Sequence, residues 1–428
     1  MAVEPALSTE DYTAIDETLR ETDRLLLQNY PGDDGTRQPV HTVYLPADRF
    51  TPALTADWGR QALAAADQQG GMEALCSSVG VPLDLVQGIS DKVTAKLVAE
   101  PIEDLRLDFE DGYGQRDDAE EDRHARSAAE LVRKSISEGS APPFIGIRFK
   151  SFEEPTRARG LRTLDLFIAG VLEAGSLPEG LVLTLPKVST VAQVEAMVFA
   201  CEKLEQVHGL EPGRLRFEVQ METPQLILAA DGTVPVATLL HRGKGRVSAL
   251  HYGTYDYTAS LEIAAAYQSM DHPAADYAKQ VMQVAVAGTG VRLSDGSTNI
   301  LPLGTKENIT AAWKLHSSLV RRSLERGFYQ GWDLHPAQLP SRFIATYLFY
   351  LQGFSQAASR LRNYAHGLES TVLDEPATAR ALARFIHRGL HCGALEESEV
   401  EHRTGITIAE LTALAHPKRI STGRDSHD

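Results

Sequence analysis

The spacing of short apolar runs restricts the folds open to this chain more than any other feature. Eight runs rich in Val, Ile, Leu and Phe alternate with longer stretches that have helical spacing of apolar side chains. Strands that alternate with helices predict a parallel sheet with right-handed crossovers, and eight such repeats predict a closed (β/α)8 TIM barrel of the α/β class. The runs are residues 42–45, 105–109, 144–149, 181–185, 215–219, 247–250, 291–293 and 332–334.

The rest of the chain divides around this barrel. We expect a helical lead-in over residues 1–40, followed by the barrel over 41–340. An alanine-rich stretch at about 51–100 predicts helices inserted after the first strand. Beyond the last strand the apolar pattern is helical only, which predicts a C-terminal helical extension over 341–420. Residues 421–428 are polar and are expected to form a disordered tail.

Composition narrows the class of function. The chain has 428 residues and a formal net charge of −16, and no basic stripe offsets this charge, so nucleic acids and anionic membranes are disfavoured as partners. It has no apolar run long enough to span a bilayer and no apolar leader, so we expect a cytoplasmic protein. Cys76, Cys201 and Cys392 match no metal or disulfide spacing. Chemistry on a small molecule is the better expectation.

Polar side chains follow six of the eight predicted strands, at the point where each strand ends. Glu222 and Asp256 follow the neighbouring runs 215–219 and 247–250. Because a barrel presents catalytic groups at its C-terminal rim, these two acids are placed to hold one hard divalent cation. Any one of these polar residues could simply be exposed to water in a loop. That explanation accounts poorly for polar residues at six of eight strand ends. The other polar residues at strand ends are Asp108, Glu110, Asp111, Arg148, Lys187 and His335.

Six motifs, in this order along the chain, resemble those of the citrate lyase β-subunit-like proteins. That family belongs to the aldolase–citrate lyase superfamily, includes the malyl-CoA lyases and is distantly tied to the malate synthases. The resemblance covers roughly residues 43–386. The motifs are Asp108-Phe109-Glu110-Asp111, Ile147-Arg148-Phe149, Leu185-Pro186-Lys187-Val188, Glu222-Thr223-Pro224, Gly253-Thr254-Tyr255-Asp256-Tyr257, and Gly327-Phe328-Tyr329-Gln330-Gly331 leading to Leu334-His335-Pro336-Ala337-Gln338.

This resemblance implies a role for each matching residue. Glu222 and Asp256 would bind Mg²⁺, with Mn²⁺ as the alternative, and Glu222 and Arg148 would contact the substrate. Arg148 would be catalytic as well, because a guanidinium can steady a developing oxyanion. Three acids would bind metal waters and orient these groups, namely Asp108, Glu110 and Asp111, and Lys187 would lie beside them without contacting the metal.

One motif in the C-terminal extension implies a further catalytic residue. The segment Val372-Leu373-Asp374-Glu375-Pro376 resembles a family segment whose aspartate reaches the active site of a neighbouring subunit. The resemblance therefore implies that Asp374 transfers a proton and that the protein is a homo-oligomer, a trimer or a hexamer. Local sequence alone supports a helix N-cap equally well, because Asp followed by Pro suits a helix start.

Three other polar residues favour a structural interpretation. A lysine at a strand end can form a Schiff base, but an ion pair with the Asp108 cluster is the better account of Lys187. His335 precedes a proline and is expected to close the barrel by hydrogen bonding. His251 is expected to be structural.

Three functions are consistent with these residues. The first is a Mg²⁺-dependent carbon–carbon lyase or aldolase that acts on a hydroxy acid or its thioester and releases or uses a 2-oxo acid. The second is a malate synthase-like transferase that condenses an acyl-CoA with a 2-oxo acid, and the third is a barrel subunit without catalysis. Members of the family that use CoA open with an Arg-Ser pair, whereas this chain reads Val40-His41-Thr42-Val43 there, so the sequence leaves CoA open.

Overall fold

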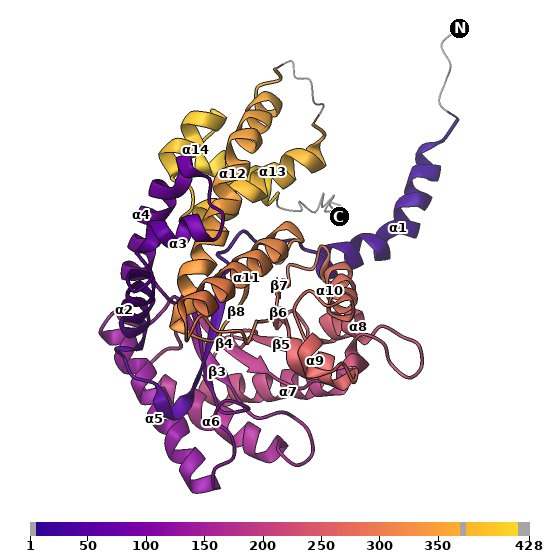
Figure 1. Cartoon of the computed structure of the whole chain (residues 1–428). Coiled ribbons are helices and arrows are strands. Elements are labelled where there is room, and N and C mark those ends of the chain that lie inside the picture. The colour runs from indigo at the N-terminus through magenta and orange to yellow at the C-terminus, as the bar shows by residue number, and fades with distance from the viewer. Residues whose placement is uncertain (1–5, 369–373, 418–428) are drawn as a thin grey trace.

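The computed structural model describes residues 6–368 and 374–417, and eight parallel strands form its centre (Figure 1). The sheet runs in the order β7-β6-β5-β4-β3-β2-β1-β8, and a parallel bridge from Ser294 to Gln330 joins its two edges. The predicted TIM barrel is confirmed as a nearly closed barrel. The strands are β1 (His41–Pro46), β2 (Asp104–Asp108), β3 (Phe144–Arg148), β4 (Leu181–Leu185), β5 (Phe217–Met221), β6 (Val247–Tyr252), β7 (Arg292–Ser294) and β8 (Gly331–Asp333).

The fifth strand begins two residues later than its apolar pattern predicts. The backbone N–H of Leu215 donates to Glu205 Oε1 at 2.7 Å, and its carbonyl accepts from Arg246 Nη1 at 3.0 Å. Side chains thus take the hydrogen bonds that a neighbouring strand would otherwise make. The strand pairs with β6 from Phe217 onward and ends at Met221, directly before Glu222.

Helices surround the barrel (Figure 1). Three of them lie between β1 and β2, where a regular barrel has one, and they account for the insertion expected at about 51–100. These are α2 (Leu54–Asp67), α3 (Met72–Ser78) and α4 (Leu83–Ala99). The helices after the later strands are α5 (Asp118–Ser137), α6 (Arg157–Leu172), α7 (Val191–His208), α8 (Pro235–Arg242), α9 (Thr254–Ser260), α10 (Pro273–Val286) and α11 (Lys306–Glu325).

Helices also flank the barrel in sequence. The 27-residue α12 (Leu339–Ala365) packs with α13 (Pro376–His391), α14 (Glu397–Thr404) and α15 (Ile408–Ala415) around a second apolar core. At the other end, α1 (Thr9–Asn29) projects from the body and buries none of its residues (Figure 1). The tail expected at 421–428 lies outside the described residues. Within the described ranges, no helix is long and apolar enough to cross a membrane.

A buried carboxylate stabilises the junction between β1 and β8. Asp333 lies 2.7 Å from Nδ1 of His41 on β1 and 3.1 Å from Nε2 of His316 on α11, and it accepts a 2.9 Å hydrogen bond from Arg342 Nη2 on α12. Burial alone would raise the pKa of Asp333, but the Arg342 guanidinium and the two imidazoles hold it well below its usual range. This network joins two strands to two helices where the three-residue β8 makes few backbone contacts.

Replacing this carboxylate should destabilise the fold. In Asp333→Ala, the buried Arg342 loses its counter-charge, so the free energy of unfolding should fall by about 3–5 kcal/mol. Urea unfolding at neutral pH measures the change. Asp57→Ala, which removes a surface partner of Arg60, is the control and should cost less than about 1 kcal/mol. Equal effects of the two substitutions would contradict the role of Asp333.

Candidate functional site

The site begins with a bidentate pair at the C-terminal ends of β2 and β3. Asp108 and Arg148 are register neighbours, and Arg148 Nε and Nη2 donate to the two Asp108 oxygens at 2.7 Å each. The backbone N–H groups of Glu110 and Gly112 also donate to Asp108, at 3.0 and 2.8 Å. A Cβ atom at Gly112 would lie 2.6 Å from Asp108 Oδ2, so a glycine is needed there. Asp108 therefore fixes the orientation of Arg148.

One nitrogen of Arg148 is less tightly held. Arg148 Nη1 lies 3.4 Å from both Gln220 Oε1 and Glu110 Oε2, which makes these contacts weak. The guanidinium lies over the Tyr44 ring, 4.7 Å from its centroid, and is buried. The arrangement thus presents one N–H-bearing nitrogen that can donate to an oxygen of a bound molecule.

Glu222 is a buried carboxylate of which one oxygen accepts a hydrogen bond from the described residues and the other accepts none. Its side chain follows β5, is 2% exposed, and accepts from the backbone N–H of Lys187 at Oε1, at 2.6 Å. Within the described residues, Oε2 accepts no hydrogen bond from protein. A Cβ atom at Gly253 would lie 2.9 Å from Oε2, so the glycine leaves space there. Burial and the nearby Asp256 carboxylate raise the pKa of Glu222 to about 7, against the opposing charge of Lys187.

A lysine ammonium lies among the remaining acids of the rim. Lys187 Nζ is 3.0 Å from Glu110 Oε1, 2.9 Å from Asp111 Oδ2 and 3.5 Å from Asp256 Oδ1. These acids raise the pKa of Lys187 even though burial opposes the charge, so the neutral amine that a Schiff base requires is disfavoured. Burial also raises the pKa of Glu110 to about 6. Lys187 itself has a φ of 49°, a left-handed conformation that is strained for a non-glycine residue.

The donor set fits a hard divalent cation held by few protein ligands. Among residues 6–368 and 374–417, no three His, Cys, Asp or Glu side chains are grouped to hold a metal ion. Glu222 and Asp256 both interact with Lys187, and the Asp256 side chain is half-exposed. Mg²⁺ commonly takes one or two carboxylates and keeps several waters, so two acids suffice if solvent or substrate supplies the other oxygens.

Asp374 does not reach this rim within its own chain. Its carboxylate forms a salt bridge with Arg360, near the C-terminal end of α12. From Leu339 at the start of that helix to Arg360 is about 32 Å at 1.5 Å per residue. The N-cap of α13 is Glu375 rather than Asp374, and the preceding residues 369–373 lie outside the described part of the chain.

The two histidines expected to be structural have protein partners. His251 Nε2 lies 2.9 Å from Glu218 Oε2 inside the barrel, and its Nδ1 accepts from Trp332 Nε1 at 3.2 Å. His335 Nδ1 accepts from the backbone N–H of Ala337 at 3.1 Å.

The sequence analysis missed a buried charged layer below the rim. Arg106 on β2 donates to Glu218 on β5 at 2.9 Å and to Thr184 on β4 at 3.0 Å, and it also pairs with Asp104. The signal was present in the strands, because Asp104 and Arg106 alternate with leucines. Charged residues at alternate positions of a strand indicate a polar barrel interior.

Comparisons with known proteins agree with the barrel. A family model described as "Domain of unknown function (DUF6986)" matches residues 19–419. A citrate lyase from Burkholderia xenovorans LB400 superposes with a TM-score of 0.55 at 20% identity, covering 89% of this chain and 97% of that one. No curated protein matches.

Two other solved structures are less similar. A magnesium/glyoxylate complex of Haloferax volcanii malate synthase has a TM-score of 0.49 at 14% identity, covering 89% of this chain and 98% of that one. The protein CitE from Mycobacterium tuberculosis, in complex with magnesium and acetoacetate, has a TM-score of 0.43 at 15% identity, with coverages of 82% and 98%. The similarity to the Burkholderia structure, at 20% identity, supports the fold alone.

The raised pKa of Glu222 predicts a pH-dependent loss of stability. Its pKa of about 7 exceeds the ordinary 4.5, so the native state binds more protons than the unfolded state between these values. The Glu222 contribution to the free energy of unfolding should therefore fall by about 3 kcal/mol as pH rises through this window. Glu222→Gln should remove this loss and be more stable than the parent at about pH 8.

Urea unfolding at several pH values, with divalent cations chelated, measures this difference. Glu130→Gln is the control, because it makes the same chemical change at a glutamate that is exposed to solvent rather than buried. If Glu222→Gln and Glu130→Gln change stability in parallel across the pH range, Glu222 does not have a raised pKa.

Proposed function

This chain belongs to the DUF6986 family, and we propose that it is a Mg²⁺-dependent carbon–carbon lyase or aldolase acting on a hydroxy acid or its thioester. The reaction would release or use a 2-oxo acid. The observation that carries the proposal is the juxtaposition of Arg148, Glu222 and Asp256 at the C-terminal rim, where barrel enzymes build their sites.

Arg148 would bind and orient the acid. Asp108 holds the Nε–Nη2 edge of its guanidinium, so Nη1 would donate to a carboxylate or keto oxygen of the substrate. The same group would stabilise the negative charge that develops on that oxygen when the carbon–carbon bond breaks. Because its position is fixed before binding, little reorganisation is needed at the reacting centre.

Glu222 and Asp256 would hold the metal, which when bound supplies Lewis-acid polarisation of the substrate oxygen. Glu222 offers Oε2, while the Lys187 backbone N–H keeps Oε1 in place. Glu110 and Asp111 would bind metal waters and would keep Lys187 as their counter-ion. The ammonium already compensates part of the acidic charge at this rim, which would limit the repulsion between the carboxylates.

Condensation on the same residues is the alternative. The segment Gly253–Tyr257 resembles the malate synthase form of its motif, and Gly253 leaves space beside Glu222. A synthase would join an acyl-CoA to a 2-oxo acid. Both functions need the oxo-acid site, so the first experiment tests that site.

We expect metal-dependent binding of a 2-oxo acid. Glyoxylate, pyruvate and oxaloacetate should be titrated calorimetrically into the protein with Mg²⁺ and with EDTA. At least one should bind with Mg²⁺ only, and Glu222→Gln or Asp256→Asn should weaken binding by about tenfold or more, because each removes a carboxylate ligand.

Glu130→Gln serves as the matched control, and it should bind as the parent does. Thermal unfolding of each variant checks that the fold is intact. Binding that is unaffected by EDTA or by Glu222→Gln would refute a metal site at this rim, and an absence of binding by all three acids would favour a non-catalytic barrel.

Asp374 would serve as the proton-transfer residue only in the site of another copy. Its distance from the rim of its own barrel and its pairing with Arg360 support this arrangement. Two inactive variants, Asp374→Asn and Glu222→Gln, should regain activity when they assemble together, because a mixed oligomer then contains some sites with both native residues.

The assay would use the acid identified by calorimetry, and each variant alone would be the control. For equal, random mixing about a quarter of the sites contain both native residues, so about a quarter of the parental activity is expected. Full activity of Asp374→Asn alone, or of a monomer at working concentration, would rule out catalysis by Asp374 in trans.

A further inference from the structure

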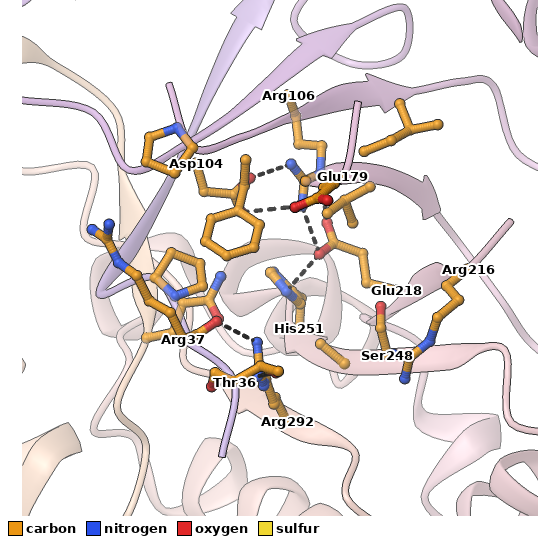
Figure 2. A pocket seen from close by; sticks show the side chains of 18 of the residues that line it. Thr36, Arg37, Asp104, Arg106, Glu179, Arg216, Glu218, Ser248, His251 and Arg292 are labelled. Carbon is orange, nitrogen blue, oxygen red and sulfur yellow. Dashed lines mark hydrogen bonds and ion pairs between the residues drawn. The ribbon is translucent and has the colours of Figure 1, made fainter. Parts of the chain in front are cut away.

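A second cavity opens at the opposite end of the barrel, away from the candidate site. It has a volume of about 440 Å³ and is lined by the first residues of several strands, among them Asp104, Phe144, Leu181 and Arg292 (Figure 2). Its size falls within the range of small-molecule sites. Residues 34–39, which precede β1, form one wall.

Three of the five arginines that line this cavity lie at its mouth, and among the described residues only Arg292 has a carboxylate partner there, Asp34 at 3.7 Å. Arg214 Nη2 donates to the carbonyls of Leu177 and Pro178, at 3.2 and 2.5 Å. Arg292 Nη1 donates to the Arg37 carbonyl at 2.7 Å, and Arg292 Nη2 is 3.7 Å from Asp34 Oδ1.

The third mouth arginine is Arg216. It is exposed and forms no salt bridge or hydrogen bond with any residue that the structure describes. Burial, together with the charge of Arg216, lowers the pKa of Arg292 below its ordinary value, although Asp34 opposes the effect. The mouth thus carries positive charge that the protein compensates incompletely.

The acids of the cavity offset this charge only in part, because Asp34 pairs with Arg292 while Arg216 has no ion-pair partner among the described residues. Asp34 accepts from the backbone N–H and the hydroxyl of Thr36, at 2.9 and 2.7 Å. The deeper Glu218 is held by Arg106 and His251, each at 2.9 Å (Figure 2). Glu179 is the other acid near the mouth, and it is exposed.

We propose that this cavity binds a small organic anion, with its carboxylate or phosphate group held by Arg216 and Arg292 at the mouth. The side chain of Ser248, which also lines the cavity, would supply a hydroxyl donor. The unpartnered Arg216 guanidinium can donate two parallel hydrogen bonds to paired oxygens of either anion. The two Nη atoms of Arg292 already donate to Thr36 and Arg37, so Arg292 would contribute mainly its positive charge. The body of the ligand would lie against the apolar wall formed by Pro143, Phe144 and Leu181.

The site would be separate from the lyase site. Its residues lie at the starts of the strands, whereas Arg148, Glu222 and Asp256 lie at or beyond their ends. A ligand here would also contact the segment before β1, which Arg292 already ties to the barrel through the Thr36 and Arg37 carbonyls. Binding should therefore stabilise the folded protein.

Calorimetric titration and thermal unfolding with succinate and with inorganic phosphate test the proposal. Ionic strength is held constant with chloride, and EDTA is present throughout. The parent should bind one or both anions saturably, and Arg216→Gln should weaken binding by about tenfold or more, because it loses a charge-assisted hydrogen bond. Arg216 has no protein partner in the described structure, so the variant should fold normally.

Two controls make the result specific. Arg123→Gln removes an exposed arginine of α5 and makes the same change in net charge, so it should bind as the parent does. Glu222→Gln should also leave this binding unchanged, which separates it from the rim site. Preference for succinate would identify a carboxylate ligand, and preference for phosphate would identify a phosphorylated one.

Other outcomes would overturn the proposal. The proposal fails if neither anion binds saturably, or if binding is equal in the parent and Arg216→Gln. It also fails if the effect of Arg123→Gln equals that of Arg216→Gln, since binding would then follow net charge rather than the cavity.

Discussion

Charge buried inside the barrel is the constraint on which this structure depends. Asp333 compensates Arg342 where β8 meets β1, Glu218 and Asp104 compensate Arg106 in the interior, and Asp108 compensates Arg148 at the rim. Two of the pairs link strands that are distant in sequence, because Arg106 lies 112 residues before Glu218 and Asp108 lies 40 residues before Arg148. Buried charges are costly unless they are paired and hydrogen-bonded, so the pairs form only when the strands are in the correct register. The barrel and its polar groups therefore fix each other's positions.

The strands could be predicted because they are defined by local pattern. The run 181–185 is apolar apart from Thr184, and apolar residues alternate with charged ones over 105–109; β4 and β2 lie there. The start of β5 could not be predicted, because Glu205 and Arg246 bind the backbone of Leu215 from outside the strand. Such contacts depend on tertiary packing that a single segment does not encode.

The positions of the rim residues follow from the strand pattern of the sequence, but the contacts that these residues make do not. Glu222, Asp256, Arg148 and Lys187 follow strands, and the barrel brings them to one face. The pairing of Asp374 with Arg360 could not be foreseen, since it depends on how α13 returns along α12. The arginines of the second cavity lie before a strand or at its first residue, where barrel enzymes do not place catalytic groups, so no catalytic pattern marks them. Barrel enzymes build their active sites at the C-terminal ends of the strands, so a catalytic pattern in the sequence points to that end alone.

Lys187 contributes to the rim in two ways, through its main-chain N–H and through its side-chain ammonium. Its left-handed φ of 49° directs its N–H to Glu222, while its ammonium compensates Glu110 and Asp111 after β2 and Asp256 in α9. Glycine and asparagine adopt this conformation readily, whereas alanine and β-branched residues do not. Asparagine or glycine would therefore remove the charge and keep the main-chain hydrogen bond, but alanine would disturb both. The substitutions that a residue tolerates are here set by its main chain as well as by its charge.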